Sequence, residues 1–307
     1  MKRVAVIDCG TNSIRLLISD IDKEKDTDKD VVREMRIVRL GEGVDKTKAF
    51  SPRALERTFK AIDEYEELLK KHNVEDLKFV ATSATRDALN KAMFIKGVID
   101  RLKVVPEVIP GTLEAKLSFD GATKSLRSKH PAPFLIIDLG GGSTELVIGD
   151  KEIEGAYSMN VGCVRMTERH CPGGNPTKEK EEAIRSDVRK ELVKAKEKVD
   201  WANAKTVVGV AGTVTTVAAH VLGLTKYDPD ILHGASITAK QISQTAQDFI
   251  NLSIQERKAL PYMHEGRIEV ITAGAIVLDE VMKAIGAQTL IASERDILDG
   301  VAWSQVQ

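Results

Sequence analysis

The chain of 307 residues is 42% hydrophobic and 30% charged, a balance typical of soluble globular proteins. Its 45 lysine and arginine residues nearly match its 46 aspartate and glutamate residues, so the formal net charge is -1. Such a small charge excludes general electrostatic attraction to nucleic acid. An aromatic content of 4% also argues against a surface on which bases stack.

The cysteines and the N-terminus indicate a reducing compartment. Cys9, Cys163 and Cys171 are odd in number and form no Cys-x-x-Cys motif, which fits the cytoplasm. Asp8 interrupts the first apolar run too early for a signal peptide, and no run is long enough to span a bilayer. We therefore expect a cytoplasmic protein with no membrane contact, long enough for two domains.

The first half of the chain predicts a three-stranded meander followed by alternating helices and strands. A polar turn, 8–13, joins the first two strands, and Ser51 before Pro52 is a typical helix start. Strands are expected at 4–7, 14–18, 31–40, 77–81 and 104–109, and helices at 52–73, 91–102 and 111–126. The proline-rich segment 128–133 predicts the domain boundary, giving domains 1–127 and 128–307.

The second half repeats this order. Strands are expected at 134–138, 144–149, 151–160, 206–210 and 289–292, and helices at 161–170, 177–199, 211–222, 239–251, 253–259, 266–285 and 296–303. The order β-β-β-α-β-α thus appears twice, about 130 residues apart, which is too long a period for a solenoid. It predicts two similar α/β domains with a cleft between them, in which the first turns of both domains meet.

The turn Asp138-Leu-Gly-Gly-Gly-Ser-Thr-Glu145 lies between two apolar strands. Its glycines permit close approach of an anion to main-chain amides, and its two carboxylates suit a hard cation such as Mg²⁺. An ordinary β-hairpin turn is the alternative explanation for these glycines.

Other polar turns carry matching chemistry. Arg15 and Arg86 are suited to phosphate oxygens, and Glu114 at a helix start is a candidate general base. Hydrolysis of a phosphoanhydride needs such charge stabilisation, a metal and a base. The sequence contains no Gly-x4-Gly-Lys-[Ser/Thr] and no zinc-binding spacing, so a P-loop nucleotidase and a zinc enzyme are disfavoured.

Four motifs occur in order: Asp8-x-Gly-Thr-Asn-Ser-Ile-Arg15, Ser83-Ala-Thr-Arg-Asp-Ala88, Gly111-x-x-Glu-Ala115 and Asp138-Leu-Gly-Gly-Gly-Ser-Thr-Glu145. Gly209-Val-Ala-Gly-Thr213, Glu256-Arg257, Leu260-Pro261 and Arg267 follow them. Together they resemble the exopolyphosphatase/guanosine-pentaphosphate phosphatase family of the sugar kinase–actin–Hsp70 superfamily. The resemblance covers nearly the whole chain.

The resemblance implies two ribonuclease-H-like (actin-like ATPase) domains and a Mg²⁺-dependent hydrolase, with Mn²⁺ as a substitute ion. It implies catalysis by Glu114, Asp138 and Glu145, and metal binding by Asp8, Asp138 and Glu145. Phosphate contacts are expected from Thr11, Asn12, Ser13, Arg15, Ser83, Arg86, Gly140, Gly141, Gly142, Ser143, Thr144, Gly212, Thr213 and Arg267. A homodimer is implied by the resemblance alone.

The chain departs from the family pattern in two respects. Leu113 stands where a second acidic residue often accompanies the catalytic glutamate, and the chain ends without the helical extension of longer relatives. We therefore expect an exopolyphosphatase that favours short polyphosphate. A guanosine-pentaphosphate 5′-phosphohydrolase, a kinase of the same superfamily and a polyphosphate-sensing module without turnover are the alternatives.

Overall fold

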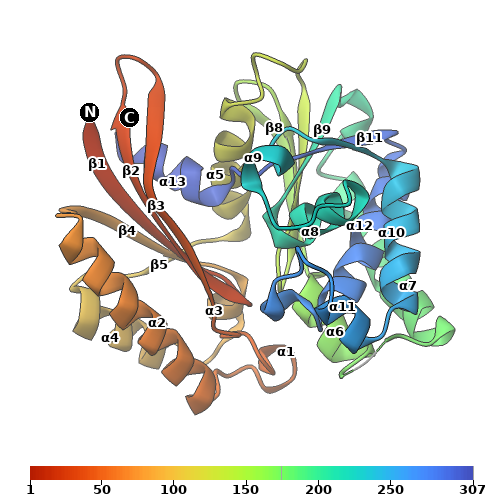
Figure 1. Ribbon diagram of the computed structural model, residues 1–307, viewed down its shortest axis with the longest axis horizontal. Coiled ribbons are helices and arrows are strands. Elements are labelled where there is room, and N and C mark those ends of the chain that lie inside the picture. The colour runs from red at the N-terminus through yellow and green to blue at the C-terminus, as the bar shows by residue number, and fades with distance from the viewer. Residues whose placement is uncertain (174, 307) are drawn as a thin grey trace. The chain divides into compact units, whose positions relative to one another are not determined.

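The computed structural model describes residues 1–173 and 175–306, which pack as two compact units. Unit 1 comprises Met1–Gly121 together with the C-terminal segment from Ile297, and unit 2 comprises Ala122–Asp296. Each unit is built on its own β-sheet flanked by helices (Figure 1). The molecule therefore has the α/β architecture of two actin-like domains that the sequence predicts.

Unit 1 contains a five-stranded sheet in the order β3-β2-β1-β4-β5. Its strands are β1 (Lys2–Cys9), β2 (Ser13–Asp22), β3 (Thr27–Ile37), β4 (Asp76–Ala81) and β5 (Glu107–Val108). Its helices are α1 (Val44–Thr47), α2 (Pro52–Lys71), α3 (Ser83–Asp87), α4 (Lys91–Leu102), the beginning of α5 (Gly111–Lys124), and α13 (Ile297–Ser304). The first three strands pair antiparallel, whereas β4 is parallel to β1 and β5 is parallel to β4.

Alternation along β1 gives the sheet of unit 1 two covered faces. Ile7 and Cys9 point toward the face covered by α2 and α4, where Tyr65 and Phe94 are fully buried. Val4 and Val6 point to the opposite face and pack with residues of α5 and α13. Cys9 is thus a small buried core residue, as its place after an apolar strand predicts.

Unit 2 contains a six-stranded sheet in the order β10-β11-β9-β6-β7-β8. Its strands are β6 (Phe134–Leu139), β7 (Thr144–Gly149), β8 (Ile153–Met159), β9 (Thr206–Val210), β10 (Ser236–Thr238) and β11 (Thr289–Ala292). Its helices are α6 (Cys163–His170), α7 (Lys178–Lys196), α8 (Ala211–Val221), α9 (Pro229–Leu232), α10 (Ala239–Asn251), α11 (Ile254–Lys258) and α12 (Ile271–Ile285), with 3₁₀ turns at Trp201–Asn203 and Glu265–Arg267.

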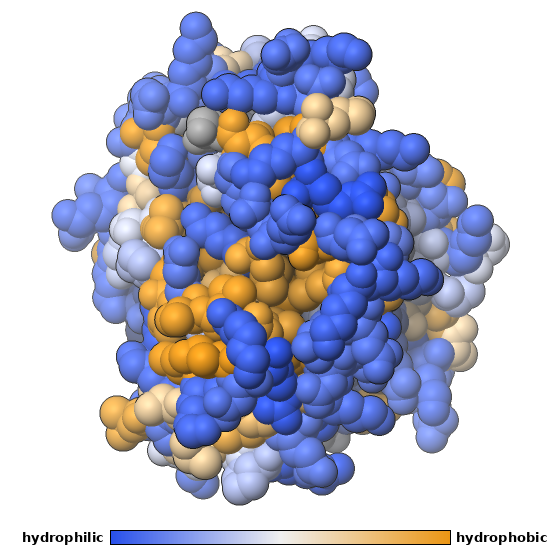
Figure 2. All heavy atoms as spheres, turned by 90° about the vertical axis from the view of Figure 1, so that its left-hand side faces the viewer, coloured by the Kyte–Doolittle hydropathy of each residue, from blue (hydrophilic) through white to orange (hydrophobic). Residues whose placement is uncertain are grey.

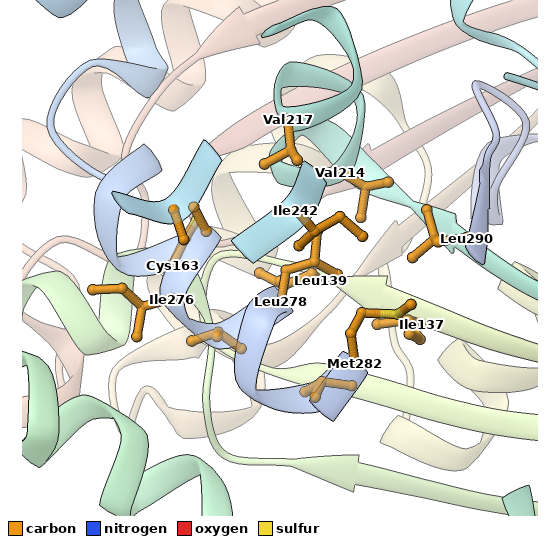
Figure 3. Close-up of a cluster of buried hydrophobic side chains, with 14 of the residues drawn as sticks. Ile137, Leu139, Cys163, Val214, Val217, Ile242, Ile276, Leu278, Met282 and Leu290 are labelled. Carbon is orange, nitrogen blue, oxygen red and sulfur yellow. The ribbon is translucent and has the colours of Figure 1, made fainter. Parts of the chain in front are cut away.

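The largest buried cluster covers one face of this sheet. The cluster includes Ile137 and Leu139 of β6, Cys163 at the start of α6, Val214 of α8 and Leu278 of α12, and Figure 3 shows Leu139 beside Leu278. All five side chains are fully or almost fully buried. This packing fixes the starts of α6 and α8 beside the carboxyl end of β6, where the glycine turn begins.

The two units repeat the same element order. A three-stranded antiparallel meander and a helix precede a strand that pairs parallel with the first strand, namely β4 with β1 and β9 with β6. The duplication predicted from the sequence is thereby confirmed. Unit 2 adds the short strand β10, which pairs antiparallel with β11 at the edge of the sheet and is absent from the sequence-based expectation.

Three expectations differ from the structure. The last helix was expected in the second domain, but Leu298 and Val301 of α13 pack with β1 and β2 of unit 1. The strand expected at 104–109 is reduced to Glu107–Val108. The helix expected from residue 266 begins at Ile271, because the His264 side chain accepts a hydrogen bond from the Gly266 amide and caps a separate 3₁₀ turn.

Among the described helices, none combines the length and hydropathy of a membrane span. Figure 2 shows hydrophobic residues gathered in the middle of the face that lies on the left in Figure 1. A groove of about 460 Å³ lies on unit 1 and is lined by Pro52, Leu55, Glu56, Phe59, Lys60, Asp63, Met93 and Arg101. None of the expected site residues lines this groove.

Candidate active site

The first polar turn, between β1 and β2, is closed by a hydrogen bond from the Gly10 amide to the Ser13 carbonyl at 3.0 Å. The carbonyls of Thr11 and Asn12 accept hydrogen bonds from the main chain that follows β3. The Gly41 amide donates to the Thr11 carbonyl, and the amides of Val38 and Arg39 donate to the Asn12 carbonyl. Gly41 makes this approach possible, because a Cβ there would lie 2.3 Å from the Thr11 methyl group.

Asp8 and Arg15 stand directly opposite each other on β1 and β2. Arg15 donates from Nη2 to Asp8 Oδ2 at 2.6 Å and from Nε to the same oxygen at 3.1 Å. Asp8 was expected to bind metal and Arg15 to bind phosphate. In this structure the two side chains form an ion pair, and both roles stay predictions.

Arg86 and Glu114 form the second charged pair of unit 1. Arg86 Nη1 donates to Glu114 Oε2 at 2.5 Å and to the Ile109 carbonyl at 2.9 Å. Glu114 lies in the first turn of α5 and is only 9% exposed. The guanidinium therefore fixes the orientation of the carboxylate, as the geometry of a general base requires.

Thr11 and Ser83 are also brought together. Their buried hydroxyl oxygens lie 2.9 Å apart, although they are 72 residues apart in the chain. Ser83 begins the short helix α3, in a segment that was expected to be a turn. Because β4 is parallel to β1, the carboxyl ends of the two strands meet at one edge of the sheet.

The second polar turn, between β6 and β7, has the same closure, from the Gly140 amide to the Ser143 carbonyl at 3.0 Å. Three consecutive carbonyls of this turn accept hydrogen bonds from α6. The amide of Cys163 donates to Gly140, and the amides of Val164 and Arg165 donate to Gly141. Arg165 Nε donates to the Gly142 carbonyl at 2.6 Å.

These contacts determine where the amides of the turn point. A trans peptide plane directs its N–H away from its C=O, so carbonyls held by α6 turn the following amides away from α6. Within residues 1–173 and 175–306, the amides of Gly141, Gly142 and Ser143 donate no hydrogen bond. A row of such amides is an anion-binding arrangement.

Gly162 permits the close packing of α6 on this turn. A Cβ at this position would lie 2.5 Å from the Gly141 carbonyl oxygen and 2.7 Å from the Gly142 carbonyl carbon. Both contacts are to main chain, so a larger residue would displace the helix or the turn. The side chain of Thr144, an expected phosphate contact, donates from Oγ1 to the Val161 carbonyl at 2.6 Å and anchors the same junction.

Asp138 and Glu145 are register partners on β6 and β7. They lie on the face of the sheet opposite Ile137, Leu139 and Leu146, which pack in the core. Asp138 is 8% exposed and Glu145 is 1% exposed. Glu145 Oε1 accepts a hydrogen bond from Ser158 Oγ at 2.7 Å, which orients this carboxylate.

This pair of carboxylates fits the requirements of a magnesium ion. Mg²⁺ binds carboxylate oxygen and usually keeps water and substrate phosphate as its other ligands, so two acids side by side suffice. Another acidic group in the described residues, Asp28, Asp30 and Asp299, is close enough to hold a cation. Arg33, however, forms ion pairs with Asp30 and Asp299, at 2.8 and 2.5 Å.

Gly212, Thr213 and Arg267 also come together in unit 2. A Cβ on Gly212 would lie 1.9 Å from Arg267 Nη2, so the guanidinium lies directly against the first turn of α8. In the described part of the chain, this partly buried guanidinium has no hydrogen bond or ion pair. A cation beside the positive end of a helix is favourable only when an anion joins them.

The residue before Gly212 has an unusual backbone conformation. Ala211 has a φ of 69°, in the left-handed region that residues with a Cβ rarely occupy. It lies where β9 ends and α8 begins, and this conformation is part of the sharp turn into the helix. Strain of this kind is concentrated at functional sites.

Sequence reasoning missed Gly162, Arg165 and Ser158. Each acts on a residue that was expected, through a contact that no local pattern reveals, because the partners are 13 to 23 residues apart. A glycine at the second position of the helix expected at 161–170 was the available signal for Gly162. No sequence signal identified Arg165 or Ser158.

Comparison with known proteins identifies the family of the chain. The model of the Ppx/GppA phosphatase family matches residues 17–307. Exopolyphosphatase 2 of Mycobacterium tuberculosis is 44% identical over 315 residues, covering 99% of this chain and 98% of that protein.

Solved structures extend this similarity to three dimensions. The crystal structure of an exopolyphosphatase-like protein has a TM-score of 0.95 at 41% identity, covering 99% of this chain and 98% of the other. That of the Aquifex aeolicus member of the Ppx/GppA family has a TM-score of 0.82 at 31% identity, covering 99% and 97%. The chain belongs to the Ppx/GppA phosphatase family.

Proposed function

We propose that this protein is a Mg²⁺-dependent exopolyphosphatase that removes the terminal phosphate from inorganic polyphosphate, preferably from short chains. The observation that carries the proposal is the row of amides from Gly141 to Ser143, whose carbonyls are tied to α6 and whose N–H groups have no partner in the described residues. The relationship to Exopolyphosphatase 2 of M. tuberculosis supports the same substrate.

The glycine turn and Arg267 would bind the phosphoryl oxygens. The amides of Gly141, Gly142 and Ser143 supply fixed donors, and the unpaired Arg267 guanidinium supplies positive charge at the first turn of α8. Preorganised donors of this kind stabilise charge that develops in the transition state. Thr11, Asn12, Ser13 and Ser83 would supply the corresponding contacts of unit 1.

Glu114 would act as the general base. Its carboxylate would take a proton from the attacking water as the new bond from water oxygen to phosphorus forms. The bridging P–O bond breaks at the same phosphorus, so the products are orthophosphate and a chain shorter by one phosphate. Arg86 donates to this carboxylate at 2.5 Å and would hold its orientation.

Asp138 and Glu145 would hold the metal. When bound there, Mg²⁺ would neutralise charge on phosphoryl oxygens, and Mn²⁺ would substitute for it. Ser158 orients Glu145 through its hydroxyl. Asp8, an expected third ligand, is engaged by Arg15, so we assign it the smaller share of metal binding.

A guanosine-pentaphosphate 5′-phosphohydrolase is the second candidate, since the bond cleaved is of the same kind. Tyr227 favours it. Its side chain is 39% exposed, and its hydroxyl donates to Glu294 Oε1 at 2.5 Å and lies 2.7 Å from Thr215 Oγ1 of α8. The charge of Arg267 acts on the same hydroxyl. An exposed aromatic ring near a phosphate-binding arginine is suited to stacking on a purine base.

A phosphate-release assay tests both candidates. Polyphosphates of several defined lengths, guanosine pentaphosphate and a nucleoside triphosphate are compared with and without Mg²⁺. The proposal predicts the highest kcat/KM for short polyphosphate and no release in EDTA. Higher kcat/KM for guanosine pentaphosphate would establish the second candidate. Binding of polyphosphate without any release would indicate a sensor, and transfer from ATP to an acceptor would indicate a kinase.

The proposal includes a cytoplasmic location and a homodimer. Cys9, Cys163 and Cys171 are buried free thiols, which fits a reducing compartment. Light scattering at several protein concentrations tests the dimer, and cell fractionation tests the location.

A further inference from the structure

Arg165 contacts two consecutive peptide groups of the glycine turn. Its backbone amide donates to the Gly141 carbonyl at 3.1 Å, and its Nε donates to the Gly142 carbonyl at 2.6 Å. The residue is 8% exposed and lies in the first turn of α6. Its guanidinium group is thus placed behind the turn, in contact with a main-chain oxygen.

The corresponding contact in unit 1 is made differently. There the Asn12 carbonyl, which corresponds to that of Gly142, accepts hydrogen bonds from two backbone amides, those of Val38 and Arg39. The Asn12 carbonyl is therefore held by main-chain donors. In unit 2, the Gly142 carbonyl is held by a side chain, so its orientation depends on the identity of one residue.

The Gly142 carbonyl and the Ser143 amide belong to one peptide plane and point in opposite directions. A donor that fixes the carbonyl therefore also fixes the direction of the Ser143 N–H. Glycine at 142 leaves this plane free to rotate, since no Cβ restricts it. We propose that Arg165 is a positioning residue that aims the Ser143 amide at the phosphoryl group of the substrate.

This inference rests on the proposed function, because it assigns the Ser143 amide to phosphate. It does not place Arg165 in contact with substrate. Hydrogen bonds from a charged donor are about twice as strong as neutral ones, which makes arginine effective in holding a single peptide plane. Methionine fills similar space without a donor, and lysine keeps the charge without the planar fork.

The test compares Arg165→Met and Arg165→Lys with the wild-type chain. Arg169→Met is the matched control, because Arg169 is an exposed arginine on the same helix that pairs with Asp187. We expect Arg165→Met to lower kcat on short polyphosphate by about 10- to 100-fold, below the usual effect of deleting an oxyanion donor outright. KM should change less than kcat, and Arg165→Lys should recover part of the loss.

A second measurement does not depend on turnover. The backbone ¹⁵N–¹H resonance of Ser143 is followed while inorganic phosphate is added to each variant. We expect a phosphate-dependent shift in the wild type and in Arg169→Met, and a much smaller one in Arg165→Met. Thermal unfolding identifies any variant that does not fold. If Arg165→Met does not fold, Arg165→Lys is compared with the wild type in its place.

The outcomes separate the two claims. If the wild type releases no phosphate from any substrate, the proposed function is wrong, while the Ser143 resonance still decides the role of Arg165. If the wild type is active and folded Arg165→Met keeps both its kcat and its Ser143 shift, the positioning role is overturned. A lower melting temperature with unchanged kcat would show that Arg165 serves stability alone.

Discussion

Asp8 and Arg15 face each other across the first hairpin and form an ion pair of 2.6 Å. The equivalent partners in the second hairpin, Asp138 and Glu145, are both acidic. The two units therefore share the same backbone turn, but the acidic residue before the turn faces a basic partner in unit 1 and an acidic partner in unit 2. In unit 1 the aspartate forms an ion pair with its partner, whereas in unit 2 two buried carboxylates are register partners, and we propose them as the cation site.

This difference predicts unequal metal dependence. Asp138→Asn should raise the Mg²⁺ concentration for half-maximal activity by about 10-fold or more, since even indirect metal partners contribute 10- to 100-fold. Asp8→Asn should raise this Mg²⁺ concentration less. Chelation with EDTA should abolish the activity of the wild type until Mg²⁺ or Mn²⁺ is restored. Titration of phosphate release with Mg²⁺ measures both variants. Equal shifts would mean that Asp8 is a full metal ligand.

Replacement of Glu114 tests the proposed base. Glu114→Gln keeps the size of the side chain and an oxygen that accepts from Arg86, but it cannot take a proton. We expect kcat to fall by about 10²- to 10⁴-fold, with little change in melting temperature. Glu67→Gln, on the exposed face of α2, is the control and should retain wild-type kcat. Near-normal turnover by Glu114→Gln would remove Glu114 from the mechanism.

Gly212→Ala should displace Arg267 without unfolding the protein. The added Cβ would collide with the end of a flexible side chain rather than with main chain, so Arg267 can move away. We expect KM for polyphosphate to rise and inorganic phosphate to bind more weakly, as in Arg267→Met. Isothermal titration with phosphate measures the loss. Unchanged affinity in both variants would place the anion elsewhere.

Burial and the charge of Arg267 lower the pKa of His264 below its ordinary value of 6.5. The unfolded chain therefore binds a proton more readily, so His264 lowers the free energy of unfolding as the pH falls through about 6.5. Phosphate bound at Arg267 should oppose that charge and raise the pKa of His264. Titration of the His264 ring resonances with and without phosphate measures the shift.

The same titration has a built-in control. Arg267→Met should raise the pKa of His264 by itself and remove its response to phosphate. If the titration midpoint of the wild type is the same with and without phosphate, no anion binds beside Arg267.

Arg257 is 1% exposed and should be a determinant of stability rather than of chemistry. It donates to the Ile268 carbonyl at 2.9 Å and to Thr272 Oγ1 at 2.6 Å, and it also donates to Asn175. Arg257→Met would leave buried acceptors unsatisfied, at about 1–3 kcal/mol each. We expect a lower melting temperature, whereas Arg53→Met on the exposed surface should leave it unchanged. An unaltered melting temperature in Arg257→Met would contradict this assignment.

The sequence determined the elements and their order. Alternating apolar residues predicted the strands, and a helix at 239–251 was placed with the bounds that the structure has. The duplication was visible because both meanders are local in sequence. The polar turns at 8–13 and 138–145 were predicted as site elements from the glycines, acids and hydroxyls that they carry between apolar strands.

Only the tertiary structure decided which groups meet. Arg86 reaches Glu114 across 28 residues, Arg165 reaches Gly142 across 23, and Arg15 neutralises Asp8 through strand register. The C-terminal helix α13 belongs to unit 1, because its apolar side chains pack on the face of β1 and β2 that lies opposite α2 and α4. These outcomes depend on side-chain packing between distant segments, which local propensity and motif spacing do not encode.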